Sequence, residues 1–174
     1  QSALSEAQTG DWFLTQNETN FQAEAAALAR DMGLHVAYAA APFDAEATRK
    51  ILPLADFLIL NAVEAAQLEA ATGQAAGDLP VKDVVVTLGA DGARWHDNRK
   101  GTVQDFAAIK VDPVDTTGAG DTFTGYVLAG LDRGQPMGQA IGMAIRAGAL
   151  MVTRHGAADA IPDLSEVQAF RQGL

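Results

Sequence analysis

A polar, glycine-rich segment in the second half of the chain combines residue types that could transfer a phosphate. It runs from Val114 to Phe123 and reads V-D-T-T-G-A-G-D-T-F. Glycines let successive backbone amides converge, and a helix that begins here adds its unpaired amides and the positive end of its dipole. Such a turn can bind an anion without a lysine. Asp121 could accept a proton from an attacking hydroxyl while the amides of Ala119 and Gly120 stabilise a phosphoryl group.

The same segment also has a purely structural interpretation. A T-G-x-G-D turn can end a strand and cap a helix, with Asp121 complementing the helix dipole. Residue types alone leave the two interpretations equally weighted. The sequence contains neither a G-x-x-x-x-G-K-[ST] loop nor a G-x-G-x-x-G turn.

Alternating strands and helices are predicted to position this segment. Apolar and β-branched runs predict strands over residues 12–16, 35–40, 57–60 and 83–88. Helices are predicted over residues 21–32, where Phe21, Ala25, Leu28 and Met32 recur at helical spacing, and over residues 44–52 and 64–72. This alternation indicates an α/β fold with a parallel sheet and helices on both sides.

The pattern changes after residues 89–92, which read G-A-D-G. Residues 93–96 and 102–106 predict a hairpin, and residues 119–131 and 137–153 predict helices. The second of these helices carries small residues that permit close packing, and residues 163–171 predict a final surface helix after Pro162. Without an internal repeat or a linker, the 174 residues are expected to form one α/β domain.

Composition limits the classes of function. The net charge of −10 opposes binding to nucleic acid and to anionic membranes. The sequence has no bilayer-length apolar run and no secretory signal. It also has no cysteine, which excludes thiolate chemistry and fits a cytoplasmic location.

The segment D-T-T-G-A-G-D-T-F resembles the C-terminal signature of the ribokinase-like (PfkB) carbohydrate kinases, D-T-x-G-A-G-D. Four further segments match family motifs in the family's order. They are Gln16-Asn17-Glu18 (Q-x-E), residues 61–64 (N-x-x-E), residues 87–92 (T-L-G-x-x-G), and residues 152–156 with 160–162, which resemble the C-terminal loop. Ribokinases are the most similar members. The resemblance implies a three-layer α/β/α fold.

The resemblance also implies a role for each matched residue. Asp121 would be the base that activates the sugar hydroxyl, Gly118, Ala119 and Gly120 the anion hole, and Glu18 a sugar contact. ATP would be the phosphoryl donor and a small sugar the acceptor. The nucleotide contacts would be Asn61, Glu64, Thr87, Leu88, Gly89, Ala90, Asp91, Gly92, Gly120 and Ile145.

Two cations follow from the resemblance. Mg²⁺ would arrive with ATP, held mainly by phosphates and water, with Glu64 near it through water. A monovalent cation, usually potassium in ribokinases, would lie beside the anion hole. Its matching positions are Asp115, Thr117, Met151, Arg154, Gly156 and Ala160. Ala160 stands where ribokinases often have a side-chain oxygen, so potassium dependence is a hypothesis.

Bare residue types also give these positions simpler roles. Asn61 and Glu64 fit a helix capping box, and Glu18 could be a solvated carboxylate. Ile145 replaces the polar residue that the family often has beside adenine.

The matched motifs all belong to the C-terminal part of the family. The N-terminal strands, the β lid and the Gly-Gly and Asp sugar motifs have no counterpart, so an incomplete kinase is expected. Ribose is the favoured substrate; fructose, 2-keto-3-deoxygluconate and nucleosides stay open, as does a homodimer. The alternative is a nucleotide-binding fragment without catalysis, and a dinucleotide-binding domain is a weaker third option.

Overall fold

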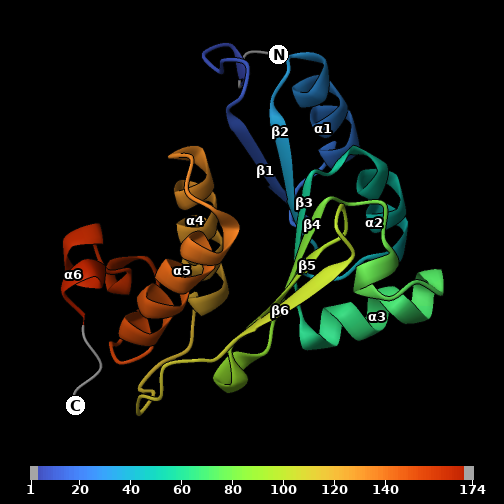
Figure 1. The fold of residues 1–174 in the computed structure, drawn as a ribbon. Coiled ribbons are helices and arrows are strands. Elements are labelled where there is room, and N and C mark those ends of the chain that lie inside the picture. Colours follow the sequence, from blue (N-terminus) through green and yellow to red (C-terminus); the bar gives the residue numbers. More distant parts are fainter. Residues whose placement is uncertain (1–3, 171–174) are drawn as a thin grey trace. The chain divides into compact units, whose positions relative to one another are not determined.

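The computed structural model describes residues 4–170, which divide into two compact units (Figure 1). The first unit contains residues up to Leu88 together with Arg94–Asp105. The second contains Gly89–Ala93 and the residues from Phe106 onward. The residues of the predicted site are therefore divided between two units.

The sheet has six strands, which follow one another in chain order from β1 to β6. The first four pair in parallel, so their carboxyl ends share one edge of the sheet. Residues 98–101 connect β5 to β6, as the predicted hairpin requires. This sheet confirms the predicted α/β fold. The strands are β1 (Trp12–Gln16), β2 (His35–Ala39), β3 (Phe57–Asn61), β4 (Asp83–Thr87), β5 (Ala93–Asp97) and β6 (Thr102–Phe106).

Three helices connect the parallel strands, and Figure 1 shows them along the same side of the sheet. They are α1 (Gln22–Asp31), α2 (Ala45–Ile51) and α3 (Ala62–Thr72), with the short 3₁₀ turns η2 (Leu52–Leu54) and η3 (Ala76–Asp78). Right-handed crossovers between strands in sequential order place successive helices on one face. Leu58, Leu60 and Val84 of the sheet pack there against Ile51 and Leu68.

The apolar face predicted for the first helix is wrong at Phe21. This residue caps α1 in the left-handed conformation, with φ of 64°, and 73% of its surface is exposed. Ala26 and Ala29 form the buried face instead, packed with Val36. The left-handed backbone places Phe21 outside the helical repeat, so its periodic spacing does not bring it to the core.

The second unit consists mainly of helices. They are α4 (Ala119–Asp132), α5 (Met137–Met151) and α6 (Leu164–Ala169), with the 3₁₀ turns η4 (Gly89–Asp91) and η5 (Ala158–Ala160). α4 packs against α5, whose small residues Ala140, Ala144 and Ala147 are fully buried. The close packing predicted from the small residues of α5 is confirmed, and α4 is its partner.

The ends of the last two helices differ from the prediction. α5 ends at Met151, two residues before the predicted end, and Val152 is its C-cap. Asp163 is the N-cap of α6, which ends at Ala169; the predicted final residue, Arg171, lies outside the described residues. The hydroxyl of Tyr126 donates to the Pro162 carbonyl at 2.6 Å and ties α4 to the segment before α6.

Candidate active site

The sugar-side and nucleotide-side motifs of the first unit follow the carboxyl ends of its parallel strands. Glu18 comes two residues after β1, Asn61 ends β3, and Thr87 ends β4. Asn61 and Thr87 are direct partners in the β3–β4 register, and the Thr87 hydroxyl donates to the Leu60 carbonyl at 3.4 Å. Ligands of open α/β sheets bind at this edge. The fold thus places side by side two separate motifs that were predicted to contact the nucleotide.

Asn61 and Glu64 form the capping box predicted as their structural role. The Asn61 Oδ1 accepts from the Glu64 amide at 2.9 Å, and the Glu64 carboxylate accepts from the Asn61 amide at 2.8 Å. Because Oδ1 serves the cap, a nucleotide contact by this side chain would use its Nδ2 donor. The cap also fixes the orientation of Glu64.

The predicted T-L-G-A-D-G turn begins in the first unit with Thr87 and Leu88 and continues in the second unit as η4. Gly89, Ala90 and Asp91 are exposed, whereas Gly92 is buried. Gly92 has φ of 109°, and a Cβ there would overlap the Phe106 carbonyl oxygen. Packing therefore requires a glycine at position 92, independently of the predicted nucleotide contact.

The Asp115–Asp121 turn of the second unit is held by its first residue. The Asp115 carboxylate accepts from the Thr117 amide at 2.9 Å and from the Gly156 amide at 3.3 Å. The amides of Val114 and Asp115 both donate to the Val152 carbonyl, at 2.7 and 3.1 Å. The hydrogen bonds from Thr117 and then Gly156 lower the pKa of Asp115. Two loops distant in sequence are joined at this carboxylate.

Gly118 converts the turn into α4. As N-cap it has φ of 77°, a conformation that favours glycine, and a Cβ there would lie 3.0 Å from the Met151 Cε. The Ala119 amide donates to the Thr116 carbonyl at 3.2 Å, which closes the turn. Of the three amides predicted to form the anion hole, that of Ala119 is therefore already hydrogen-bonded within the turn.

Asp121 lies in the first turn of α4 and is exposed. At this position a carboxylate lies near the positive end of the helix dipole, where a negative phosphate would also be stabilised. The geometry of the turn thus places an acceptor for a proton next to donors for an anion, in one short segment.

Four of the six positions predicted for a monovalent cation lie around the same turn of the second unit. Asp115, Thr117 and Gly156 are joined by hydrogen bonds, and Met151 lies beside Gly118. The Arg154 guanidinium is turned to Glu166, at 2.7 Å, so only its backbone could serve a cation. Ala160 is buried in η5, and Ile145 is half-buried in α5.

The monovalent cation at these positions stays a prediction. The matched positions offer backbone carbonyls with one carboxylate, Asp115. Among the described residues, no three histidine or acidic side chains are grouped to hold a metal ion. Residues 4–170 also contain no helix with the length and apolar character needed to cross a bilayer.

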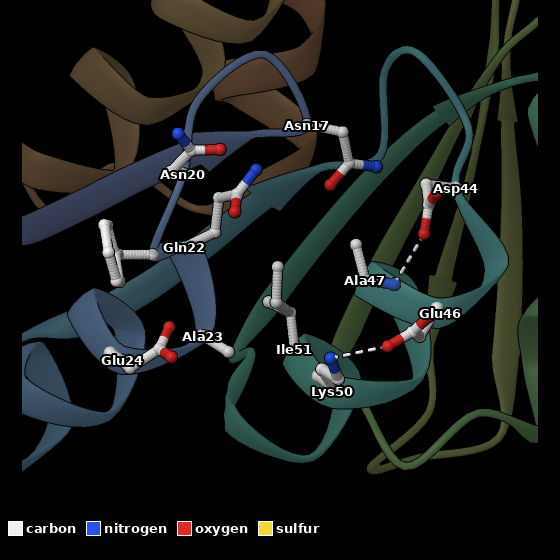
Figure 2. A pocket seen from close by; sticks show the side chains of 11 residues that line it. Asn17, Asn20, Gln22, Ala23, Glu24, Asp44, Glu46, Ala47, Lys50 and Ile51 are labelled. Atoms are coloured by element: carbon white, nitrogen blue, oxygen red, sulfur yellow. Dashed lines mark hydrogen bonds and ion pairs between the residues drawn. The ribbon is translucent and has the colours of Figure 1, made fainter.

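A cavity of about 530 Å³ lies in the first unit between the start of α1 and α2 (Figure 2). Its lining includes Asn17, Asp44 and Lys50 but not Glu18. Asp44 caps α2 by accepting from the Ala47 amide at 2.7 Å, and Lys50 pairs with Glu46 at 2.7 Å. These polar groups already have partners, and the cavity contains none of the predicted site residues.

Comparison with known proteins agrees with the motifs. The model of the pfkB family carbohydrate kinases matches residues 8–164. A ribokinase of Lactococcus lactis is 43% identical over 86 residues, which are 49% of this chain and 28% of that protein. The chain therefore spans less than a third of this curated relative.

Solved structures match a larger part of the chain. The ribokinase of Thermotoga maritima superposes with a TM-score of 0.79 and 32% identity, covering 91% of this chain and 56% of that one. The aminoimidazole riboside kinase of Salmonella enterica, complexed with aminoimidazole riboside and an ATP analogue, gives 0.80 and 28%, covering 92% and 62%. The likeness extends over both compact units of this chain.

Proposed function

The chain belongs to the pfkB family of carbohydrate kinases, and on this premise we propose that its protein transfers the γ-phosphoryl group of ATP to a hydroxyl of a small sugar. The observation that carries the proposal is the Asp115–Asp121 turn. Within it Gly118, in the left-handed conformation, starts a helix whose first turn contains both Gly120 and Asp121. A proton acceptor and an anion-binding helix end are what phosphoryl transfer to a hydroxyl requires.

In the proposed reaction the sugar oxygen attacks the γ-phosphorus while the bond from that phosphorus to the leaving ADP oxygen breaks. Asp121 takes the hydroxyl proton. The amides of the turn stabilise charge on the transferring group. Asp115 maintains this turn through its bonds to Thr117 and Gly156.

The nucleotide is assigned to the motifs at the carboxyl ends of β3 and β4. Asn61 and Thr87 lie next to each other there, and the capping box holds Glu64 beside them. Mg²⁺ bound to ATP would neutralise phosphate charge, and the Glu64 carboxylate would reach its water shell. Potassium at the carbonyls around Asp115 is proposed as an activator.

Ribose is proposed as the acceptor, with Glu18 as a sugar contact. Ribokinases occur among both the sequence relatives and the structural neighbours, which supports this choice. The riboside kinase likewise has a ligand with a ribose unit. Other sugars and nucleosides are alternatives that the same assay distinguishes.

The rival function is nucleotide binding without catalysis, because the chain covers only part of each relative. The test measures ADP formation by the full-length protein with ATP, Mg²⁺ and a panel of ribose, fructose, 2-keto-3-deoxygluconate and nucleosides. Ribose-dependent ADP formation is expected. ATP that raises the melting temperature while no member of the panel stimulates ADP formation would contradict the proposal and favour the rival.

A further inference from the structure

A buried tyrosine links the proposed sugar-side segment to helix α2. Tyr38 of β2 is fully buried. Its hydroxyl donates to the Asn17 Oδ1 at 2.8 Å and lies 3.1 Å from the Thr48 hydroxyl. Since the single phenolic proton goes to Asn17, the Thr48 hydroxyl is the donor of the second bond. The result is a directed chain from Thr48 through Tyr38 to Asn17.

Asn17 is fixed by every polar group of its side chain. Its Oδ1 accepts from Tyr38, and its Nδ2 donates to the Pro42 carbonyl at 2.9 Å. Its backbone amide also donates to the Ala41 carbonyl at 3.0 Å. The segment after β1 is thereby anchored to the segment after β2. The next residue, Glu18, is exposed.

The apolar packing of the core does not require the Tyr38 hydroxyl. Its cluster is otherwise apolar and includes Ala40, Leu58 and Leu60, and a phenylalanine ring would occupy the same place. A buried hydroxyl costs free energy unless it is hydrogen-bonded. Burial raises the pKa of Tyr38, so the group remains a donor through the neutral range. The Tyr38 hydroxyl donates to Asn17, the residue that precedes Glu18. This hydrogen bond therefore indicates a role in holding the segment that contains the predicted sugar contact.

We propose that Tyr38, acting through Asn17, is a positioning residue for sugar binding by Glu18. The inference rests on the proposed function, because it takes Glu18 as a sugar contact. Tyr38 itself touches no substrate. Its effect is to hold the 16–18 segment in one conformation, so that less ordering is needed when the sugar binds.

The test compares Tyr38→Phe with Tyr126→Phe in the full-length protein, using D-ribose and ATP. Each variant removes a tyrosine hydroxyl that donates a hydrogen bond. The Tyr126 hydroxyl donates to the Pro162 carbonyl, within the second unit. Tyr38→Phe is expected to raise the KM for ribose about three- to tenfold, the range of one hydrogen bond. The KM for ATP and kcat stay unchanged, and Tyr126→Phe alters none of the three.

A second pair keeps the test decisive if Tyr38→Phe folds poorly. Thr48→Val removes the hydroxyl that orients Tyr38, and Thr48→Ser retains it. Thr48→Val should raise the KM for ribose while Thr48→Ser restores the wild-type value. Amide hydrogen exchange at residues 17–21 should quicken in the variants that break the chain.

These measurements distinguish a failure of the proposed function from a failure of the positioning role of Tyr38. If no sugar or nucleoside of the panel stimulates ADP formation by the wild-type protein, the proposed function fails and this inference with it. If the wild type is active and Tyr38→Phe quickens exchange at residues 17–21 without changing the KM for ribose, only the positioning role is overturned.

Discussion

The Asp115 carboxylate lies 3.3 Å from the amide nitrogen of Gly156, and this hydrogen bond joins two loops that are 41 residues apart in sequence. The same side chain accepts from Thr117 within the proposed anion-binding turn. Asp115 thus connects the start of α4 to the loop after α5. The turn depends on a contact outside its own motif.

This connection predicts a pH dependence of stability. The Thr117 and Gly156 hydrogen bonds lower the pKa of Asp115 below its ordinary value of 3.8. The stabilisation is therefore fully present above pH 3.8 and is lost as the pH falls through the lowered pKa. Asp115→Asn should lower the melting temperature at neutral pH, and the difference from wild type should shrink in acid. Thermal melts across this range measure it; a difference that is independent of pH would contradict the role of the charge.

Substitution of Gly120 should change the stability of the protein and its activity in opposite directions. A Cβ at Gly120 meets nothing within 4 Å, and the same holds for Gly125 on the same helix. Replacing either helical glycine by alanine should stabilise the protein by up to about 1 kcal/mol. If the phosphoryl group lies against the Gly120 amide, the methyl group of Gly120→Ala, which leaves that amide in place, should hold the phosphoryl group away from it and reduce kcat about tenfold or more. Gly125→Ala is the matched control and should retain full turnover, so equal activity of the two variants would count against the anion hole.

Asn61 has a capping role that is observed and a nucleotide role that is proposed, and two substitutions separate them. Asn61→Ala removes the cap and should lower the free energy of unfolding by about 1 kcal/mol. Asn61→Asp keeps an oxygen acceptor for the Glu64 amide and should preserve stability. Both remove the Nδ2 donor, so both should raise the KM for ATP. An Asn61→Asp variant that binds ATP like wild type would leave Asn61 as a cap alone.

Much of the fold was predictable because local signals agreed with packing. The run D-V-V-V-T predicted a buried strand, and β4 occupies it with Val84 and Val85 fully buried. The spacing of Asn61 and Glu64 predicted a capping box, which both hydrogen bonds confirm. These features depend on residues close together in sequence.

The features that sequence did not predict depend on distant contacts. The family resemblance places Asp115 and Gly156 near one predicted cation, but it does not indicate that the Asp115 carboxylate accepts from the Gly156 amide. Nothing around Tyr38 indicates that its hydroxyl meets Asn17 and Thr48. The helical spacing wrongly placed Phe21 on the buried face of α1, because the left-handed backbone at Phe21, and not its spacing, decides where its side chain lies. The roles of Glu18, Asp121 and the cation positions stay predictions from the family resemblance.

The central claim, that Asp121 is the general base of a sugar kinase, is tested most directly by Asp121→Asn in the full-length protein. The substitution keeps the size of the side chain and removes its ability to take a proton. A general-base role for Asp121 predicts that ribose-dependent ADP formation falls about 100-fold or more, while ATP raises the melting temperature as in wild type. Turnover close to wild type in this variant would contradict it.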